Sequence, residues 1–293
     1  GIGYYKRLAV FVDNAIPGEV VEVKITETKD KYAIGELIKI KEASPERVSP
    51  PCQYFGTCGG CQIQHLSYPE QLRQKQLLLI EAFNRYYQGD LHKIKFYDTL
   101  GMDDPWHYRN KSSLPVRHDG KKVVVGMYAK NSNHLVYIDK SIVENELITK
   151  KRQEILDILT KANVDIYNPR TQSGSLRYLV IRGFEETNEV QVTFVMTNAD
   201  RKLIDILKKL DVTSANYSIN KDPKAIEIFG DNVINVAGKK KINGILGDLH
   251  FEISPSAFFQ LNSKQTLVLY EEIAKAARLT GKEKVLDAYC GIG

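Results

Sequence analysis

Three of the four cysteines in this 293-residue chain lie within a single short stretch. Cys52, Cys58 and Cys61 follow the spacing C-x5-C-x2-C, and Gly59-Gly60 separates the last two. Glycines permit the tight turns that let side chains of one loop face a common point. Thiolates are the ligands that iron–sulfur clusters and zinc prefer. The stretch therefore predicts a soft-metal centre that needs a fourth ligand from elsewhere, in preference to three unrelated buried thiols.

A second stretch suited to ligand binding lies at the end of the sequence. Lys284 to Tyr289 is expected to be a short buried strand, and Asp287-Ala-Tyr-Cys-Gly291-Ile-Gly293 has the pattern D-x-x-x-G-x-G. Small residues after a strand let a ligand approach the backbone at the carboxyl end of a parallel sheet. Alone the signal is weak, because many α/β proteins have a strand–glycine turn. An NAD fingerprint would need a third glycine and a later acid, which the sequence does not contain.

Composition excludes some classes of protein. Hydrophobic residues make up 43% and charged residues 26%, as in ordinary globular domains. The net charge of +5 permits a polyanionic partner without requiring one. No apolar run is long enough to span a membrane, and no signal peptide opens the chain. Four cysteines do not form a disulfide framework, so we expect a cytoplasmic protein without a membrane partner.

The elements expected to position these residues begin with short strands. They are followed by a proline-rich linker at 44–51, and then by a helix over 67–87 whose start carries the capping box Ser67-Tyr-Pro-Glu70. The first strands, with a bulge at Gly35, predict a small barrel whose basic and acidic residues balance, so RNA affinity would have to come from one face; a purely structural barrel is the alternative. Expected strands are 8–12, 20–25, 32–40, 121–128, 134–138, 176–182, 189–196, 226–229 and 249–253, and expected helices are 144–162, 200–210 and 263–279.

The order of elements after the cysteines indicates an α+β layer. In the helix over 144–162, Ile148, Ile155, Leu159 and Ala162 share one face. In the last helix, the residues expected to face inward are Leu267, Tyr270, Ala274 and Ala277. The run Lys239-Lys-Lys241 is expected to be a solvated turn, with a phosphate contact as the alternative.

Five motifs in order make the chain resemble the RNA uracil-5-methyltransferase family, in particular bacterial 23S rRNA (uracil-5-)-methyltransferases. The pattern D-x-x-x-G-x-G is similar to motif I of S-adenosylmethionine-dependent methyltransferases. The resemblance covers nearly the whole chain. The motifs are Phe11-Val-Asp-Asn-Ala-Ile-Pro-Gly-Glu19, the cysteine stretch to Leu66, Tyr108-Arg-Asn-Lys111, Ile253-Ser-Pro-Ser-Ala-Phe-Phe-Gln-Leu-Asn262 and Asp287 to Gly293.

The resemblance implies a multidomain protein. Residues 1–45 would form a TRAM domain, a small OB-like β-barrel that binds RNA. Residues 46–63 and 96–257 would form an α+β central domain with the cysteine-rich metal site. Residues 64–95 and 258–293 would belong to the start of a Rossmann-like α/β methyltransferase domain.

The same resemblance implies the ligands of the metal. Cys52, Cys58 and Cys61 match the first three ligands of the family's [4Fe–4S] cluster. Ser141 stands where the family has its fourth cysteine, and a serine is a poor substitute for a thiolate. Cys290 cannot replace it, because Cys290 belongs to motif I. A zinc site that adds His65, in the spacing C-x5-C-x2-C-x3-H, is the alternative.

The remaining site residues also come from the resemblance. Gln260, Tyr289, Asp287, Gly291 and Gly293 would bind S-adenosylmethionine, with Asp287 holding the glycine turn. Phe258 would stack on the target base, as aromatic side chains commonly do in RNA sites. Core packing is the plainer interpretation for one of the pair Phe258 and Phe259.

The activity implied is methylation of C5 of a uridine in 23S rRNA. In the family a cysteine thiolate adds to C6, C5 attacks the methyl donor, and a carboxylate removes the C5 proton. That cysteine belongs to a Cys-Asp-Pro-Pro motif expected beyond Gly293, so no catalytic residue is assigned to this chain. The alternatives are a tRNA uridine-5-methyltransferase and a non-catalytic RNA-binding metalloprotein fragment. A radical S-adenosylmethionine enzyme is disfavoured, because it would need C-x3-C-x2-C. We expect a monomer with 23S rRNA as its partner.

Overall fold

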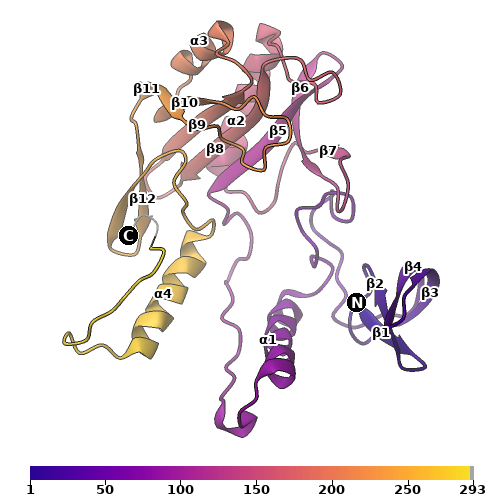
Figure 1. Cartoon of the computed structure of the whole chain (residues 1–293). Coiled ribbons are helices and arrows are strands. Elements are labelled where there is room, and N and C mark those ends of the chain that lie inside the picture. The colour runs from indigo at the N-terminus through magenta and orange to yellow at the C-terminus, as the bar shows by residue number, and fades with distance from the viewer. Residues whose placement is uncertain (291–293) are drawn as a thin grey trace. The chain divides into compact units, whose positions relative to one another are not determined.

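The computed structural model describes residues 1–290, and the chain divides into two compact units (Figure 1). The first unit contains Gly1–Gly101 and Ala129–Ser132, and the second contains Met102–Tyr128 and the chain from Asn133 onward. Gly291 and Gly293, which the sequence assigns to the methyl donor, lie outside the described residues.

A four-stranded sheet opens the first unit. Its strands are β1 (Ile2–Tyr5), β2 (Leu8–Val12), β3 (Val20–Thr28) and β4 (Tyr32–Glu42), in the order β1-β2-β4-β3. Strands β2 and β4 run parallel, whereas the other pairs are antiparallel. The strands predicted at 8–12, 20–25 and 32–40 are confirmed, and β1 was not predicted from the sequence.

Gly35 of β4 lies close against the Val23 side chain of β3. A Cβ atom on Gly35 would lie 2.2 Å from Cγ1 of Val23, so only glycine fits without a shift. The register slips between Ile25 and Glu27, opposite Gly35, which places the predicted bulge on the partner strand. The small core beside it contains Val10, Val12 and Ala33.

Helix α1 (Tyr68–Tyr86) follows the cysteine stretch and begins as its capping sequence predicts. The Ser67 hydroxyl accepts a hydrogen bond from the Glu70 amide, whereas the Glu70 carboxylate binds Arg73 and Gln74 instead of turning back. The apolar side chains of this helix are only partly covered, because Leu79 is 52% exposed. The short 3-10 helix η1 (Leu91–Lys93) comes next.

The second unit is built on a seven-stranded sheet in the order β11-β10-β9-β8-β5-β6-β7. Only β9 and β10 run parallel, because helix α3 carries the chain between them. The strands are β5 (Lys111–Asp119), β6 (Lys122–Tyr128), β7 (Leu135–Tyr137), β8 (Leu176–Phe184), β9 (Glu189–Met196), β10 (Ser214–Ile219) and β11 (Val233–Gly238).

Two helices pack against one face of this sheet. Helix α2 (Glu146–Ala162) contacts β6 and β8, and α3 (Arg201–Lys209) contacts β10 and β11. Ile148, Ile155 and Leu159 are fully buried in this layer, as the helical spacing predicts. Asn145 caps α2 by accepting from the Ile148 amide, and Asp200 caps α3 in the same way.

The opposite face of the sheet carries a hairpin and irregular chain. A Cβ on Gly183 would contact Leu147 and Ile148 of α2, whereas its neighbour Phe184 packs against Ile242. Successive residues of a strand point to opposite faces. The hairpin of β12 (Ile242–Leu246) and β13 (Leu249–Ile253) therefore covers the face that α2 leaves open.

Three expectations about the chain after residue 220 are wrong. Residues 226–229 form no strand, because the Asn220 amide group donates to the carbonyls of Glu227 and Ile228 and holds a loop instead. Residues 284–289 are exposed and unpaired, since no described strand lies beside them to complete a sheet. In α4 (Ser263–Ala277), Ala274 and Ala277 are exposed.

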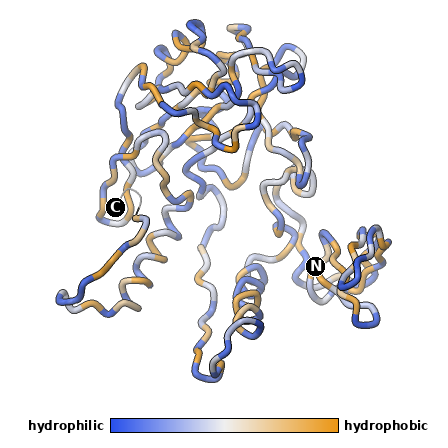
Figure 2. Tube along the Cα trace, viewed as in Figure 1, coloured by the Kyte–Doolittle hydropathy of each residue, from blue (hydrophilic) through white to orange (hydrophobic). Residues whose placement is uncertain are grey.

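Apolar side chains consequently remain uncovered on α4 and along the described segment that follows it. Figure 2 shows hydrophobic positions on α4 and on the segment after it. Exposed side chains there are Leu269, Tyr270, Ile273, Leu279, Val285, Leu286 and Tyr289. A cluster of this size is characteristic of a surface that packs against another protein segment.

Candidate functional site

Two sequence motifs that lie 150 residues apart meet in the second unit. We call this place the motif junction; it consists of residues 108–111, at the start of β5, and residues 254–262, before α4. The Asn110 amide donates to the Leu261 carbonyl at 3.0 Å, and Arg109 pairs with Asn262 as an antiparallel bridge. The Asn110 side chain, 4% exposed, donates to the Gln260 carbonyl at 2.8 Å and to the Ser263 hydroxyl at 3.0 Å. The backbone around Gln260 is therefore held firmly.

Arg182 of β8 holds the other end of the same loop. Its guanidinium donates to the Ser254 carbonyl at 3.2 Å and to the Ala257 carbonyl at 2.6 Å. The side chain is 2% exposed, and burial lowers its pKa to about 10. Both of these contacts are with neutral carbonyls, so this cation orders the loop without being neutralised by it. An arginine that follows an apolar run in the strand is the signal that sequence reasoning missed.

The neighbours Phe258 and Phe259 point to different environments. Phe259 is 8% exposed and packs edge-on against Phe184, with ring centroids 5.5 Å apart, and against Phe251 at 5.8 Å. Phe258 is 72% exposed. One of the pair is thus core, as the sequence interpretation allowed, and the other presents a ring to solvent. Gln260 is also exposed.

Lys111 adds a second, half-buried cation beside Arg182. The two residues are register partners on β5 and β8. Burial, followed by the charges of Arg182 and Arg109, lowers the pKa of Lys111 to about 8. Its ammonium lies 5.4 Å from the centroid of the Phe229 ring. Sequence reasoning missed Phe229, whose loop only the tertiary structure brings to this strand.

The nearest buried carboxylate does not cancel these charges. Glu144 is hydrogen-bonded to the Ser112 hydroxyl at 2.6 Å and forms a buried ion pair with Arg152. Ser112 adjoins Lys111 on β5, so the two side chains point to opposite faces of the sheet. The motif junction therefore presents an exposed aromatic ring beside uncompensated cations, an arrangement that binds an unstacked base together with its phosphate.

The cysteine stretch lies in the first unit as an irregular loop. The Phe55 amide donates to the Cys52 carbonyl, the Cys58 amide donates to the Tyr54 carbonyl, and the Gly60 amide donates to the Cys58 sulfur at 3.4 Å. Burial, and then the nearby Cys61 and Cys52, raise the pKa of the Cys58 thiol. The thiols therefore lie within electrostatic reach of one another. Among residues 1–290, however, no three His, Cys, Asp or Glu side chains converge in a metal-binding arrangement.

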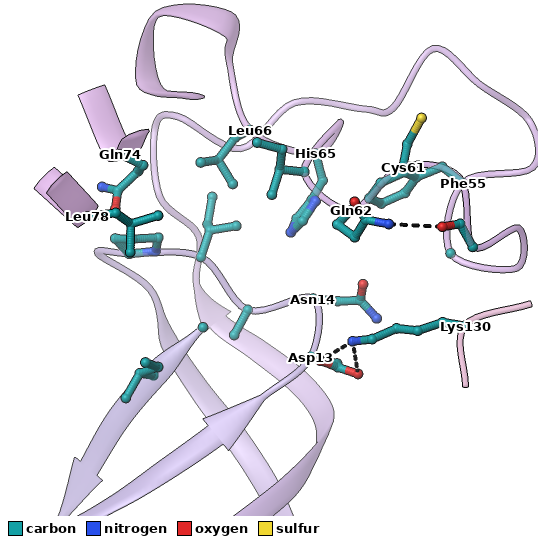
Figure 3. Close-up of a pocket in the computed structure, with 18 of the residues that line it drawn as sticks. Asp13, Asn14, Phe55, Cys61, Gln62, His65, Leu66, Gln74, Leu78 and Lys130 are labelled. Carbon is teal, nitrogen blue, oxygen red and sulfur yellow. Dashed lines mark hydrogen bonds and ion pairs between the residues drawn. The ribbon is translucent and has the colours of Figure 1, made fainter. Parts of the chain in front are cut away.

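His65 lies beside this loop in a cavity of about 630 Å³ (Figure 3). It is 5% exposed, neither ring nitrogen has a hydrogen-bond partner in the described part of the chain, and burial lowers its pKa. The ring packs at 5.2 Å from that of Phe55, and the labelled sulfur of Cys61 points away from it. The structure therefore does not assemble the Cys/His zinc site considered from the spacing.

The residues expected to bind the methyl donor are not gathered into a pocket by the described chain. Tyr289 is fully exposed, and the surrounding segment with Asp287 is exposed as well. A fully exposed side chain cannot form the wall of a cavity. Within residues 1–290, no helix is long and apolar enough to cross a membrane.

Comparison with known proteins now adds to this geometry. The TRAM domain family matches residues 1–38. An uncharacterized RNA methyltransferase of Bacillus cereus is 43% identical over 299 residues, which is 100% of this chain and 65% of that protein. An uncharacterized RNA methyltransferase of Halalkalibacterium halodurans is 40% identical and is covered to 64%.

The solved structures contain a match as well. The crystal structure of Pyrococcus abyssi tRNA (uracil-54, C5)-methyltransferase in complex with S-adenosyl-L-homocysteine matches with a TM-score of 0.71 and 25% sequence identity, covering 91% of this chain and 60% of that one. The chain thus begins with a TRAM domain, is similar throughout to proteins named RNA methyltransferases, and spans about 65% of the length of the curated relatives it matches.

Proposed function

We propose that this chain is part of an S-adenosylmethionine-dependent RNA uracil-5-methyltransferase, and that the motif junction receives the target uridine. The observation that carries the proposal is the exposed Phe258 ring on a loop clamped by Arg182 and Asn110. A rigid loop that leaves one aromatic ring in solvent suits stacking on a base extruded from RNA. Similarity over the whole chain to proteins named RNA methyltransferases supports the same proposal.

In this proposal the residues of the chain bind and orient the RNA. Phe258 stacks on the uracil, while Lys111 and Arg109 attract the adjacent phosphate. Asn110 fixes the backbone of Gln260, and Gln260, Asp287, Tyr289, Gly291 and Gly293 are proposed to contact the methyl donor. S-adenosylmethionine supplies an electrophilic methyl group when bound. No cysteine of this chain is proposed as the nucleophile.

We propose 23S rRNA as the substrate, because the cysteine stretch is typical of the rRNA-modifying branch. A tRNA uridine is the second candidate, and the match to a tRNA methyltransferase structure favours it. The proposed domains are those expected above: 1–45, 46–63 with 96–257, and 64–95 with 258–293. The exposed apolar side chains on α4 and after it would be covered by the rest of the methyltransferase domain.

The cysteine loop is proposed to hold an iron–sulfur cluster through Cys52, Cys58 and Cys61. Two observations support the cluster: the three cysteines share one loop, and the Gly60 amide donates a hydrogen bond to the Cys58 sulfur. The absence of a converged set of metal ligands among the described residues opposes it. Anaerobically purified protein is expected to show visible charge-transfer absorption that a C58S variant loses. Zinc without visible absorption, or no metal at all, would contradict the assignment.

Methyl transfer from labelled S-adenosylmethionine to unmodified RNA tests the function in the full-length protein. We expect label in 5-methyluridine of 23S rRNA and at least a tenfold loss of rate in F258A, with recovery in F258W. Label in tRNA alone would move the assignment to the second candidate. A methylated base other than uracil would refute the proposal.

A further inference from the structure

The second unit contains a pocket that is separate from the motif junction and is lined by tyrosines and basic residues. Its volume is about 230 Å³, below the range of about 300–1,000 Å³ that suits drug-sized ligands, so it has room for one small planar group. The lining that matters here consists of Tyr128, Tyr167, Tyr178, Arg117, Arg177 and Lys224. We call it the tyrosine pocket. Two prolines and a glutamine complete its lining, which contains no carboxylate.

Arg177 forms the cationic floor of the tyrosine pocket. One of its terminal nitrogens donates to the Asn220 carbonyl at 2.7 Å, the Asn220 side-chain oxygen at 3.1 Å and the Asp222 carbonyl at 2.9 Å. The guanidinium carbon lies 5.2 Å from the Tyr167 ring centroid and 5.9 Å from that of Tyr178. The side chain is 5% exposed, and its Nε–H has no hydrogen-bond partner among residues 1–290. A buried charged group without an acidic partner favours an anionic ligand.

Hydroxyl groups form the polar edge of the pocket. Burial, followed by the influence of the neighbouring Tyr128 hydroxyl, raises the pKa of Tyr178. Arg117 reaches the Tyr128 hydroxyl at 3.5 Å. Tyr128 is 40% exposed, so one ring of the set is accessible from solvent. Together these groups offer a stacking surface, a donor–acceptor edge and positive charge.

The register of the sheet places the tyrosine pocket in line with the motif junction. Lys111 pairs with Arg182, and Pro115 pairs with Tyr178, four residues further along both strands. Residues four apart on a strand share a face, and at the usual rise they are separated by about 13 Å. Tyr178 therefore lies on the face of the sheet that carries Arg182 and the loop of Phe258.

We propose that the tyrosine pocket binds an unstacked nucleotide of single-stranded RNA, a short distance along the strand from the nucleotide received at the motif junction. The inference rests on the proposed function and extends it, since it names a second contact of the same RNA. Tyrosine rings with an arginine over two of them, those of Tyr167 and Tyr178, are of the kind that binds exposed bases. An acidic peptide would use the cations but would leave the three rings without a role.

Fluorescence anisotropy with fluorescein-labelled octauridylate tests the inference on the whole chain. We expect Y128A to weaken binding about tenfold, as loss of one base–aromatic stack does. Y137A is the matched control, because Tyr137 lies on the neighbouring strand β7 and is 41% exposed but does not line the pocket. It should change affinity less than twofold, and Y128F should bind nearly as the parent does. R117Q should reduce the slope of log affinity against log salt by about 0.7.

The outcomes separate this inference from the proposed function. Failure of the parent chain to bind octauridylate would overturn the RNA-binding function and the pocket together. Binding by the parent with equal affinities for Y128A and Y137A would overturn the tyrosine pocket alone. Displacement of octauridylate by polyglutamate in the parent but not in Y128A would assign the pocket to an acidic peptide and also overturn the inference. Circular dichroism spectra of the variants should superimpose.

Discussion

Replacing Phe259 with alanine should destabilise the second unit strongly, whereas the same change at Phe258 should not. Phe259 is 8% exposed and contacts both Phe184 and Phe251, so the truncation removes a buried ring and leaves a cavity. Substitutions of this kind cost about 3–5 kcal/mol, and two edge-on aromatic contacts place the value in the upper half of that range. Phe258 is 72% exposed, so its truncation should alter the free energy of unfolding by about 0.5 kcal/mol or less.

Urea unfolding followed by fluorescence and circular dichroism measures the difference. Trp106 is the chain's single tryptophan and lies two residues before the motif junction, so its emission reports on this unit. RNA affinity should respond in the opposite order: F258A should weaken octauridylate binding about tenfold while remaining folded. Equal destabilisation by the two variants would refute the assignment of one ring to the core and the other to the ligand. Wild-type RNA affinity in F258A would refute its stacking role.

Three further outcomes follow from the geometry. The pKa of Lys111 is about 8, so RNA affinity should fall between pH 7 and 9 as the lysine loses its proton, and K111M should remove this dependence in anisotropy titrations. Without RNA, the free energy of unfolding should rise between about pH 8 and pH 10.5. In that range Lys111 is deprotonated in the folded protein but still protonated in the unfolded chain. G35A should destabilise the TRAM sheet by about 1–3 kcal/mol in thermal melts, since its Cβ would meet the stiff Val23 side chain, and an unchanged melting temperature would contradict that close approach. N145A should cost about 1–2 kcal/mol in urea titrations, because it removes the cap of α2 and a buried bond to the Gly183 carbonyl, and a loss below 0.5 kcal/mol would count against that role.

Local patterns predicted many of the elements well. Ser67, Asn145 and Asp200 are short polar residues before apolar helical spacing, and each one caps its helix. Strands β9 and β13 have the bounds that their alternation predicts. These signals succeed because capping and alternation are satisfied within a few residues and do not depend on distant partners.

Predictions failed where they depended on packing partners that the described residues do not provide. Residues 284–289 have the composition of a buried strand, but such a strand needs strands beside it, and none of the described strands takes that position. Ala274 and Ala277 have helical spacing, but no segment within residues 1–290 covers them. The spacing of the three cysteines predicted that they lie on one loop. It does not specify the backbone and side-chain angles on which convergence of their sulfurs depends.

The sequence by itself determined the capped helices, most of the strands, the cysteine loop and the motifs that mark an RNA methyltransferase-like chain. Only the tertiary structure decided that Asn110 and Arg182 clamp the loop of residues 254–262, that Phe258 rather than Phe259 faces solvent, and that three tyrosines share a pocket on the same face of the sheet. The physical reason is the distance along the chain over which each interaction acts. Caps and alternation are fixed by neighbours in the chain, whereas strand register brings together residues that no local pattern relates.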